Sequence, residues 1–255
     1  CYHGDIDIIV HLSGSVGGIG FNKDSQGELC YKNLQMGMNV LEAAHQAKVS
    51  KVIMIGTTCS YPHSPKTIPF VEDELFDGMP EITNSGYGVA KRTLIKLGME
   101  YSKQYGMNIV NLIPTNMFGP FDHFEENKSH VIPAIIKKFD ECDNGVVELW
   151  GTGNASRDFL YVEDCVRAIV TAIDRDVGCD PINLGTGVEV SIREVAEIIK
   201  RVGNFNADIK FLSTGPDGQP RRCLNIDRAK KILRWEPSTT LEDGLRRTIE
   251  WYKNE

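Results

Sequence analysis

Buried strands alternate with amphipathic helices along the first half of the chain, and this alternation constrains the fold more than any other feature. Apolar runs at residues 7–12, 51–56 and 108–113 have the length and composition of buried strands. Between them, residues 28–49 and 87–106 carry apolar side chains at helical spacing. Strands joined by helices of this length form right-handed crossovers, so we expect an α/β fold with a doubly wound, parallel, Rossmann-like sheet.

The alternation of long strands and helices changes after residue 121, where the predicted elements become shorter. We expect helices and strands in turn at residues 131–142, 146–151, 162–173, 181–185, 192–202, 208–212 and 241–254. This pattern is typical of a smaller lobe interleaved with the end of a sheet. We therefore divide the chain into a partial Rossmann-like nucleotide-binding core, residues 1–120, and a mainly substrate-binding C-terminal α/β lobe, residues 121–255.

Composition excludes several classes of function. A chain of 255 residues, of which 41% are hydrophobic, can bury a sizeable core. Its net charge of −7 argues against nucleic-acid binding, so an anionic ligand requires a local basic cluster. No apolar run approaches the roughly 20 residues of a membrane helix, and we expect no membrane partner. The seven scattered cysteines lack C-x-x-C pairing, which predicts no disulfide framework, no metal site and a reducing, cytoplasmic compartment.

Gly14, Gly17 and Gly20 follow the first strand in the spacing G-x-x-G-x-x-G. A dinucleotide fingerprint needs a helix directly after the glycine turn and a second strand that ends in a ribose-reading residue. The stretch after Gly20 is polar, so we expect no helix there, and residues 51–56 run into GTTCSYP. We interpret the glycines as a loop at the carboxyl end of a strand; a loop that only requires small residues is the alternative. We expect the sheet to be N-terminally truncated, with the true fingerprint and the residue that selects NAD or NADP in a missing first βαβ unit.

The stretch SGYGVAK places Tyr87 and Lys91 about one turn apart on one face of a helix. An ammonium beside a phenol favours the phenolate and lowers its pKa, which suits a general acid/base that acts on a sugar hydroxyl or carbonyl. Upstream, the strand end IGTTCSYP offers the hydroxyls of Thr57 and Thr58 and the thiol of Cys59. These groups together can polarise a substrate oxygen. A solvated helix face is the alternative interpretation of the Tyr-Lys pair alone.

Together with PTNMFGP, RDFLYVEDCVRAI and INLGTG, these motifs resemble the extended short-chain dehydrogenase/reductase family, the NAD-dependent epimerases and dehydratases of nucleotide sugars. The resemblance runs from the first strand to the last helix. Four stretches, VHLSGSVGGI, GTTCSYP, NKSHVIPAIIKKF and PDGQPRRCLNIDRAKKILRW, are similar to segments of the family's GDP-4-keto-6-deoxymannose 3,5-epimerase/4-reductases. The resemblance implies a cytoplasmic enzyme that forms GDP-L-fucose by C3/C5 epimerisation and NADPH-dependent C4 reduction.

The resemblance implies catalytic roles for five residues. Thr57 stands in the place of the family's catalytic serine, and Tyr87 and Lys91 complete the triad. Cys59 and His130 fall at the pair that moves protons at C3 and C5. A thiol can act as a base here, because protons beside a polarised keto group are acidic. A buried structural thiol and a helix-start histidine are the alternatives for Cys59 and His130.

The resemblance also implies the ligand contacts. Cofactor contacts are expected from Leu12, Ser13, Thr57, Tyr87, Lys91, Pro114, Asn116, Met117 and His130. Substrate contacts are expected from Thr58, Asn116, Lys138, Trp150, Arg157, Asp217 and Arg222. The expected cofactor is NADP, with NAD as the alternative, and the expected partners are a GDP-sugar and a second copy of the chain. Two residues depart from the family's pattern: Thr57 adds a methyl group to the usual serine, and Lys138 lacks the bidentate fork of the usual arginine.

Two other functions stay open. One is another nucleotide-sugar 4-epimerase, 4-reductase or dehydratase of the same family, since one scaffold hosts many sugar chemistries. A 4-epimerase would keep its NAD tightly bound and would not oxidise added NADPH. The other is a non-catalytic dinucleotide- or sugar-binding scaffold, which the missing fingerprint suggests.

Overall fold

The computed structural model of the chain describes residues 6–17, 19–125, 129–212 and 218–255. Its centre is a four-stranded parallel sheet in the order β1-β2-β3-β8. The strands are Ile8–His11, Lys51–Ile55, Ile109–Pro114 and Ile182–Leu184. Every residue of β3 and β8 is buried, as expected of strands that are covered on both faces.

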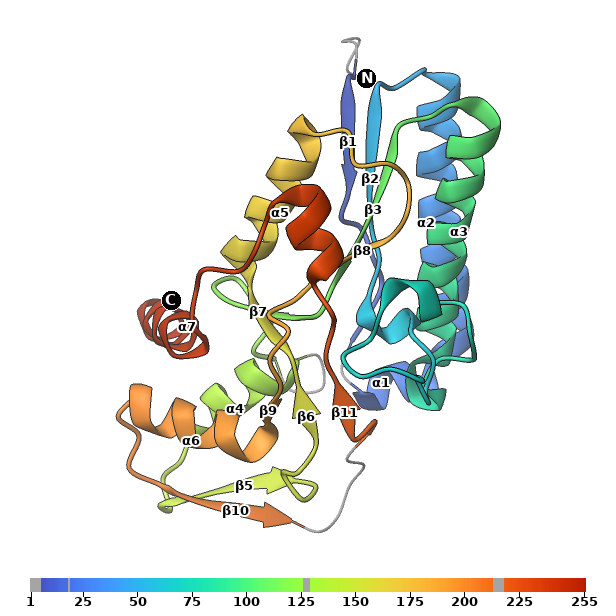
Figure 1. Cartoon of the computed structure of the whole chain (residues 1–255). Coiled ribbons are helices and arrows are strands. Elements are labelled where there is room, and N and C mark those ends of the chain that lie inside the picture. The colour runs from blue at the N-terminus through green and yellow to red at the C-terminus, as the bar shows by residue number, and fades with distance from the viewer. Residues whose placement is uncertain (1–5, 18, 126–128, 213–217) are drawn as a thin grey trace.

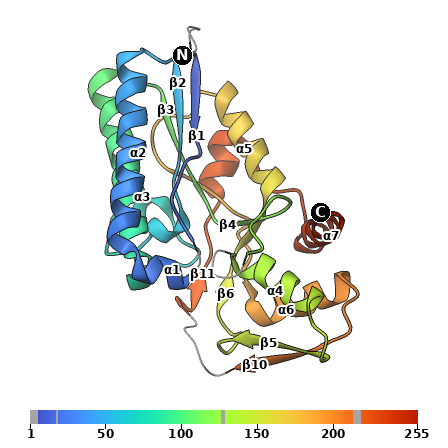
Figure 2. The same ribbon diagram turned by 180° about the vertical axis from the view of Figure 1, so that it is seen from behind.

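Helices cover both faces of this sheet. On one face, α2 (Gln26–Gln46) and α3 (Ser85–Tyr105) lie side by side (Figure 1). On the other lie α5 (Val162–Asp174) and the short π-helix η4 (Ala229–Leu233) (Figure 2). Leu41 and Leu94 share one apolar core with the sheet residue Met54, whereas α5 and η4 pack in another. This two-sided cover confirms the doubly wound α/β fold that the sequence predicts.

A second unit lies beyond the carboxyl ends of the strands (Figure 1). It contains three helices and a parallel pair of strands: α4 (Val131–Asp140), α6 (Ile192–Val202), α7 (Leu241–Asn254), β5 (Val146–Trp150) and β10 (Asp208–Leu212). Ile136, Leu149, Val195 and Ile249 meet in its core. The chain after residue 121 supplies this unit and also α5 and β8 of the main sheet.

Five short strands between the two units were not predicted. They are β4 (Asn116–Phe118), β6 (Ser156–Arg157), β7 (Phe159–Tyr161), β9 (Val190–Ser191) and β11 (Arg221–Arg222). β4 pairs with β7, and β6 pairs with both β9 and β11. Strands of two or three residues leave no periodicity in a sequence. Their pairing is nevertheless important, because it places Arg222 beside Arg157 at the junction of the units.

The short helix α1 (Ile19–Asp24) shows that the expectation of no helix directly after Gly20 is wrong. Asn22 is buried, and its side-chain oxygen accepts a hydrogen bond from the Gly17 backbone at 3.0 Å. Its amide group donates to the side chain of Asn84 at 2.8 Å. Polar side-chain hydrogen bonds therefore hold this helix, whereas the sequence prediction relied on an apolar face.

Candidate functional site

The turn after β2 places three of the candidate residues. Thr57 precedes the 3-10 helix η1 (Thr58–Ser60), and its hydroxyl accepts a hydrogen bond from the Cys59 backbone at 3.2 Å. Thr58 is buried, and its hydroxyl has no hydrogen-bond partner among the described residues. Polar side chains thus gather at the carboxyl end of β2, the edge of a doubly wound sheet where ligands bind.

Helix α3 holds this turn in place. Arg92 donates to the Ser60 carbonyl through Nε at 2.7 Å and through Nη2, and its Nη1 donates to the Gly78 carbonyl. The Ser60 hydroxyl donates to the Gly88 carbonyl at 3.2 Å. A Cβ atom at Gly88 would lie 2.3 Å from the Cys59 carbonyl oxygen, so the glycine permits this close approach of the two backbones. Sequence reasoning missed Arg92, because its partners are backbone carbonyls that no motif reveals.

Tyr87 lies in the first turn of α3 and meets the turn after β2. Its phenol shares a hydrogen bond with the Thr57 side chain, and Cys59 is close enough to act on it electrostatically. Burial raises the pKa of Tyr87, the Cys59 charge raises it further, and the hydrogen bond with Thr57 opposes both. The expectation that the pKa of Tyr87 lies below its ordinary value is therefore wrong, because burial dominates and raises it. The phenol stays protonated near neutral pH, which is the form that a proton donor needs.

Lys91 is a buried cation at the same edge of the sheet. Its side chain is only 4% exposed, and Nζ donates to the Ile55 carbonyl at 3.1 Å and to the Ser13 carbonyl at 3.4 Å. Gly14 lies against it, since a Cβ atom there would come within 3.6 Å of Nζ. Burial lowers the pKa of Lys91 to about 8. The ammonium is therefore mostly charged at neutral pH and is held between the ends of β1 and β2.

The glycine loop after β1 is held by a residue that sequence reasoning missed. The Ser15 backbone donates to the Asn33 side chain at 3.0 Å, and the Asn33 amide donates back to the Ser15 carbonyl at 2.8 Å. His11, the last residue of β1, is also buried, and its Nε2 has no partner among the described residues. Burial, and then the charge of Lys91, lowers the pKa of His11. A histidine at the end of an apolar strand is the sequence signal that could have identified His11.

The remaining predicted cofactor residues follow the carboxyl ends of the strands. Pro114 ends β3, and the Asn116 amide donates to the Asp158 carbonyl at 2.9 Å. Leu12 and Met117 are exposed apolar side chains. With the buried atoms of Thr58 and His11 that have no partner among the described residues, and the exposed side chains of Leu12 and Met117, this edge fits a ligand that is both polar and apolar, as a nicotinamide nucleoside is. His130, the residue before α4, is exposed, and its side chain makes no capping hydrogen bond.

Arg222 reaches Cys59 from a distant part of the chain. Its Nη1 lies 3.5 Å from the Cys59 sulfur, and the two residues are 163 positions apart in the sequence. The side chain is only 8% exposed. Its Nε donates to the Gln219 side chain at 3.2 Å. The structure thus joins a residue predicted to contact the substrate with the residue predicted to be the base.

Lys138 and Trp150 form a separate pair in the second unit. The Lys138 ammonium lies 5.4 Å from the centre of the Trp150 ring and donates to the Glu148 carbonyl at 2.7 Å. Trp150 is 68% exposed, so its ring is open to a ligand. No hydrogen bond or ring contact within the described part of the chain links this pair to Thr57 or Tyr87.

Arg157 and Asp217 complete the predicted substrate contacts. Arg157 lies in β6, directly beside Arg222 of β11. Its Nη1 donates to the Ser156 carbonyl at 2.7 Å, and a Cβ atom at Gly218 would come within 3.3 Å of its Nη2. Asp217 lies outside the described residues.

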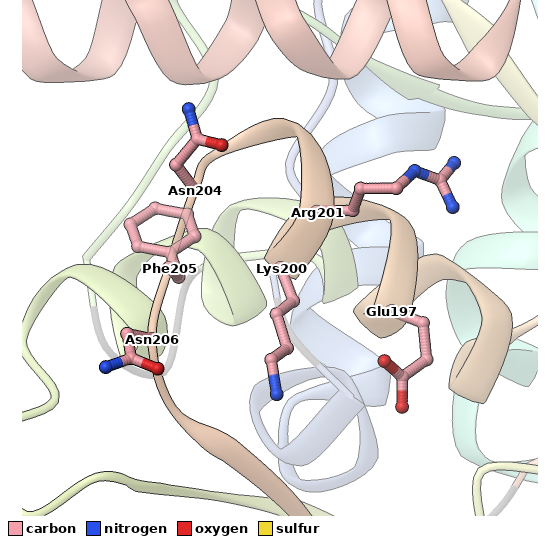
Figure 3. A pocket seen from close by; sticks show the side chains of 6 residues that line it. All are labelled: Glu197, Lys200, Arg201, Asn204, Phe205 and Asn206. Atoms are coloured by element: carbon pink, nitrogen blue, oxygen red, sulfur yellow. The ribbon is translucent and has the colours of Figure 1, made fainter.

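A hollow lies at the end of α6, and none of the residues that line it belongs to the predicted site (Figure 3). It is lined by Glu197, Lys200, Arg201, Asn204, Phe205 and Asn206, none of which the sequence analysis singled out. Lys200 pairs with Asp208 at 3.6 Å, and Arg201 pairs with Glu242. Because its cations are already paired, the hollow is a poor site for an anionic ligand.

Three further features concern the described residues as a whole. All six of their cysteines are free. No group of three or more His, Cys, Asp or Glu side chains among them is arranged to hold a metal ion. Within the same residues, no helix combines the length and the apolar character that crossing a membrane requires.

Comparison with known proteins gives matches over most of the chain. The NAD dependent epimerase/dehydratase family matches residues 2–185. A GDP-L-fucose synthase of Sinorhizobium fredii is 40% identical over 245 residues, which cover 95% of this chain and 77% of that protein. The structure of a GDP-L-fucose synthetase from Naegleria fowleri bound to NADP aligns with a TM-score of 0.88 at 28% identity, over 97% of this chain and 77% of that one. A GDP-6-OMe-4-keto-L-xylo-heptose reductase from C. jejuni also gives 0.88, at 27% identity over 97% and 82%.

Proposed function

The chain belongs to the NAD dependent epimerase/dehydratase family, and on that premise we propose that it converts GDP-4-keto-6-deoxymannose to GDP-L-fucose. It is an NAD(P)-dependent epimerase/reductase. One observation carries the choice of reaction: Tyr87 bonds to Thr57 and lies near Cys59, so a phenol, a hydroxyl and a thiol share one strand end. These groups can polarise a carbonyl and take protons from the carbons beside it.

Epimerisation begins at the polarised C4 carbonyl. The Thr57 and Tyr87 hydroxyls donate hydrogen bonds to its oxygen, which makes the C–H bonds at C3 and C5 acidic. The Cys59 thiolate takes a proton, and the electrons of the broken C–H bond move into an enolate that the same two hydroxyls stabilise. His130 returns a proton to the opposite face of the carbon, and the electron pair forms the new C–H bond. Cys59 then releases its proton to solvent and His130 takes one up from solvent, and the same exchange at the second carbon completes the epimerisation.

Reduction follows at C4. NADPH supplies the hydride when it is bound. Tyr87 gives its proton to the C4 oxygen, and burial raises its pKa, so the phenol is protonated when that step occurs. Lys91 would provide a buried positive charge beside the ribose of the bound cofactor, and Leu12, Ser13, Pro114, Asn116 and Met117 would line its nicotinamide. The NADP-bound relative supports NADP over NAD.

The GDP part of the substrate is assigned to the side chains at the junction and in the second unit. Arg157 contacts the diphosphate and ribose, and Trp150 with Lys138 borders the nucleotide; Asp217, outside the described residues, stays a contact expected from the sequence alone. An exposed indole beside an ammonium can bind both a base and a phosphate. The GDP-sugar names of the relatives support this substrate class.

The proposal includes a homodimer formed by α2 and α3. These helices leave Tyr31, Met38 and Tyr105 substantially exposed, at 62%, 44% and 46%. Large apolar side chains on two neighbouring helices are suited to packing against the same pair of a second copy. Light scattering tests this: we expect twice the mass of the chain, and Tyr31→Glu to reduce it. The free cysteines of the described residues support a reducing, cytoplasmic compartment.

The test follows NADPH absorbance with GDP-4-keto-6-deoxymannose in heavy water, and then measures the mass of the product. We expect NADPH oxidation together with two carbon-bound deuterium atoms from the solvent. Cys59→Ser should abolish deuterium uptake and leave NADPH binding intact, with Cys142→Ser as the control. Normal uptake in Cys59→Ser would show that Cys59 is not the base.

A 4-reductase without epimerisation is the second candidate, because the C. jejuni relative is named as a reductase of a 4-keto GDP-heptose. The same heavy-water experiment distinguishes the 4-reductase from the epimerase/reductase by deuterium uptake. NADPH oxidation without deuterium at C3 or C5 supports the 4-reductase. No oxidation and no deuterium rejects both candidates for this substrate.

A further inference from the structure

The two arginines of β11 lie in opposite environments. Arg221 is exposed, and its guanidinium forms a salt bridge with Glu189 at 2.5 Å. Arg222 is buried, and its guanidinium faces the sulfur of Cys59 at 3.5 Å. Adjacent residues of a strand point to opposite sides, so the chain carries a functional candidate and a matched control next to each other.

Arg222 is fixed at both its backbone and its side chain. Its carbonyl accepts from the Asp158 backbone at 3.0 Å as β11 pairs with β6. Its Nε is bonded to the side chain of Gln219, which is itself buried and donates to the His63 carbonyl at 2.8 Å. Turning the guanidinium away from Cys59 would break this chain of hydrogen bonds. The contact with the sulfur is therefore built into the fold and does not depend on a bound substrate.

The charged side chains around Arg222 include no salt-bridge partner for it among the described residues. Glu81 is the nearby buried carboxylate: burial raises its pKa, but the hydrogen bonds from Thr83 and the charges of Arg222 and His63 outweigh this and lower it. Glu81 is thus an anion that compensates Arg222 from a distance, since no carboxylate of the described residues forms a salt bridge with Arg222. A guanidinium N–H bonds a neutral thiol weakly and a thiolate strongly.

We propose that Arg222 is the positioning residue for Cys59: its N–H donates a hydrogen bond to the sulfur and holds it aimed at the sugar before proton abstraction. This deepens the proposed function, in which Cys59 is the base. When the sulfur takes a proton from carbon, the negative charge moves to the enolate and the N–H···S bond weakens, while Arg222 stays a cation throughout. The role differs from the predicted one, in which Arg222 contacts the substrate.

The test measures the reactivity of the thiol without any substrate. Iodoacetamide alkylates thiolates, and peptide mass spectrometry gives the rate at Cys59 separately from the other cysteines. We expect Arg222→Gln to slow alkylation of Cys59 about tenfold or more at neutral pH, Arg222→Lys to restore part of the rate, and Arg221→Gln to leave it unchanged. Cys30, Cys142 and Cys179 are partly exposed and serve as internal references, because unchanged rates there show that each variant is folded.

A second measurement separates this role from substrate binding. Calorimetry with GDP should give the same Kd for the parent protein, Arg222→Gln and Arg222→Lys. A Kd raised about tenfold in Arg222→Gln, with Cys59 alkylated at the parent rate, overturns the proposal in favour of a diphosphate contact. Parent behaviour in both measurements also overturns it.

The proposed function can fail independently of this inference. The alkylation rate of Cys59 could depend on Arg222 while the Cys59→Ser variant still takes up deuterium at the normal rate. This result would support the contact between Arg222 and Cys59 and would reject Cys59 as the base.

Discussion

Arg92 donates two N–H groups of one guanidinium to the carbonyl oxygen of Ser60, the residue after Cys59. Its third contact is the Gly78 carbonyl. The helix that carries Tyr87 therefore also holds the turn that carries Cys59. One side chain thus holds together the elements that carry the proposed proton donor, Tyr87, and the proposed base, Cys59.

Replacing Arg92 with Met should loosen this turn. Losing the partly buried, charged hydrogen bonds is expected to lower the free energy of unfolding by roughly 2 kcal/mol, as measured by urea denaturation. Lys96→Met is the control on the same helix, because Lys96 is half exposed and pairs with Glu100 one turn along. We expect that variant to stay within about 0.5 kcal/mol of the parent. Equal effects of the two substitutions would contradict the role of Arg92.

Tyr87→Phe should slow reduction at C4 by about 10² to 10⁴, because the alkoxide that forms there loses its proton donor. The measurement is a stopped-flow record of NADPH absorbance at saturating substrate. Tyr101→Phe is the matched control, since Tyr101 lies on the same helix and donates its hydroxyl to the exposed Glu42. A reduction rate in Tyr87→Phe equal to that of the control would exclude Tyr87 as the donor.

Lys91 should reduce the stability of the cofactor-free protein in a pH-dependent way. Its pKa is lowered from 10.5 to about 8, so the unfolded chain binds more protons between these values. The cost of the buried charge is therefore complete below about pH 8 and disappears as the pH rises toward about 10.5. We expect Lys91→Met to be more stable than the parent by roughly 2 kcal/mol at neutral pH, and this gain to shrink as the pH rises.

Urea denaturation at a series of pH values checks this expectation. Lys96→Met should show no comparable gain at any pH. A Lys91→Met variant that is less stable than the parent at neutral pH would mean that its bonds to the Ile55 and Ser13 carbonyls outweigh the cost of burial.

Lys51, at the start of β2, should matter for stability alone. Its ammonium donates to the carbonyls of Ala172, Ile173 and Arg175 at 3.1, 2.5 and 2.8 Å, and so caps the carboxyl end of α5. We expect Lys51→Met to lower the free energy of unfolding by roughly 2 kcal/mol, because buried carbonyls lose a charged donor at a helix end. Thermal unfolding measures the loss, and exposed Lys103→Met is the control. An altered GDP affinity in Lys51→Met would contradict this purely structural role.

The long elements were predictable because one physical signal determines them. The apolar period of α3 gave residues 87–106, and the structure gives Ser85–Tyr105. The strands of the central sheet are apolar runs for the same reason: they are buried on both faces. α1 had no such signal, since Asn22 holds it through hydrogen bonds with residues that only the folded chain brings close.

The candidate site was predictable only for residues that belong to a motif. Tyr87 and Lys91 are set by helical spacing, and the structure keeps them on one helix. Arg92 and Asn33 hold the site through hydrogen bonds to backbone atoms of other segments. The residues next to them in the sequence therefore do not indicate this role. The raised pKa of Tyr87 was missed because burial, the largest cause, depends on packing that spacing alone does not reveal.

The contact between Cys59 and Arg222 also orders events during synthesis of the chain. The ribosome releases Cys59, Tyr87 and Lys91 long before β11 is made, because Arg222 lies 163 residues after the cysteine. A nascent chain can pair β1, β2 and β3 while the thiol still lacks its arginine. In the proposed function Cys59 is the base, and its sulfur gains the contact with Arg222 only when β11, the last of the described strands, has been made.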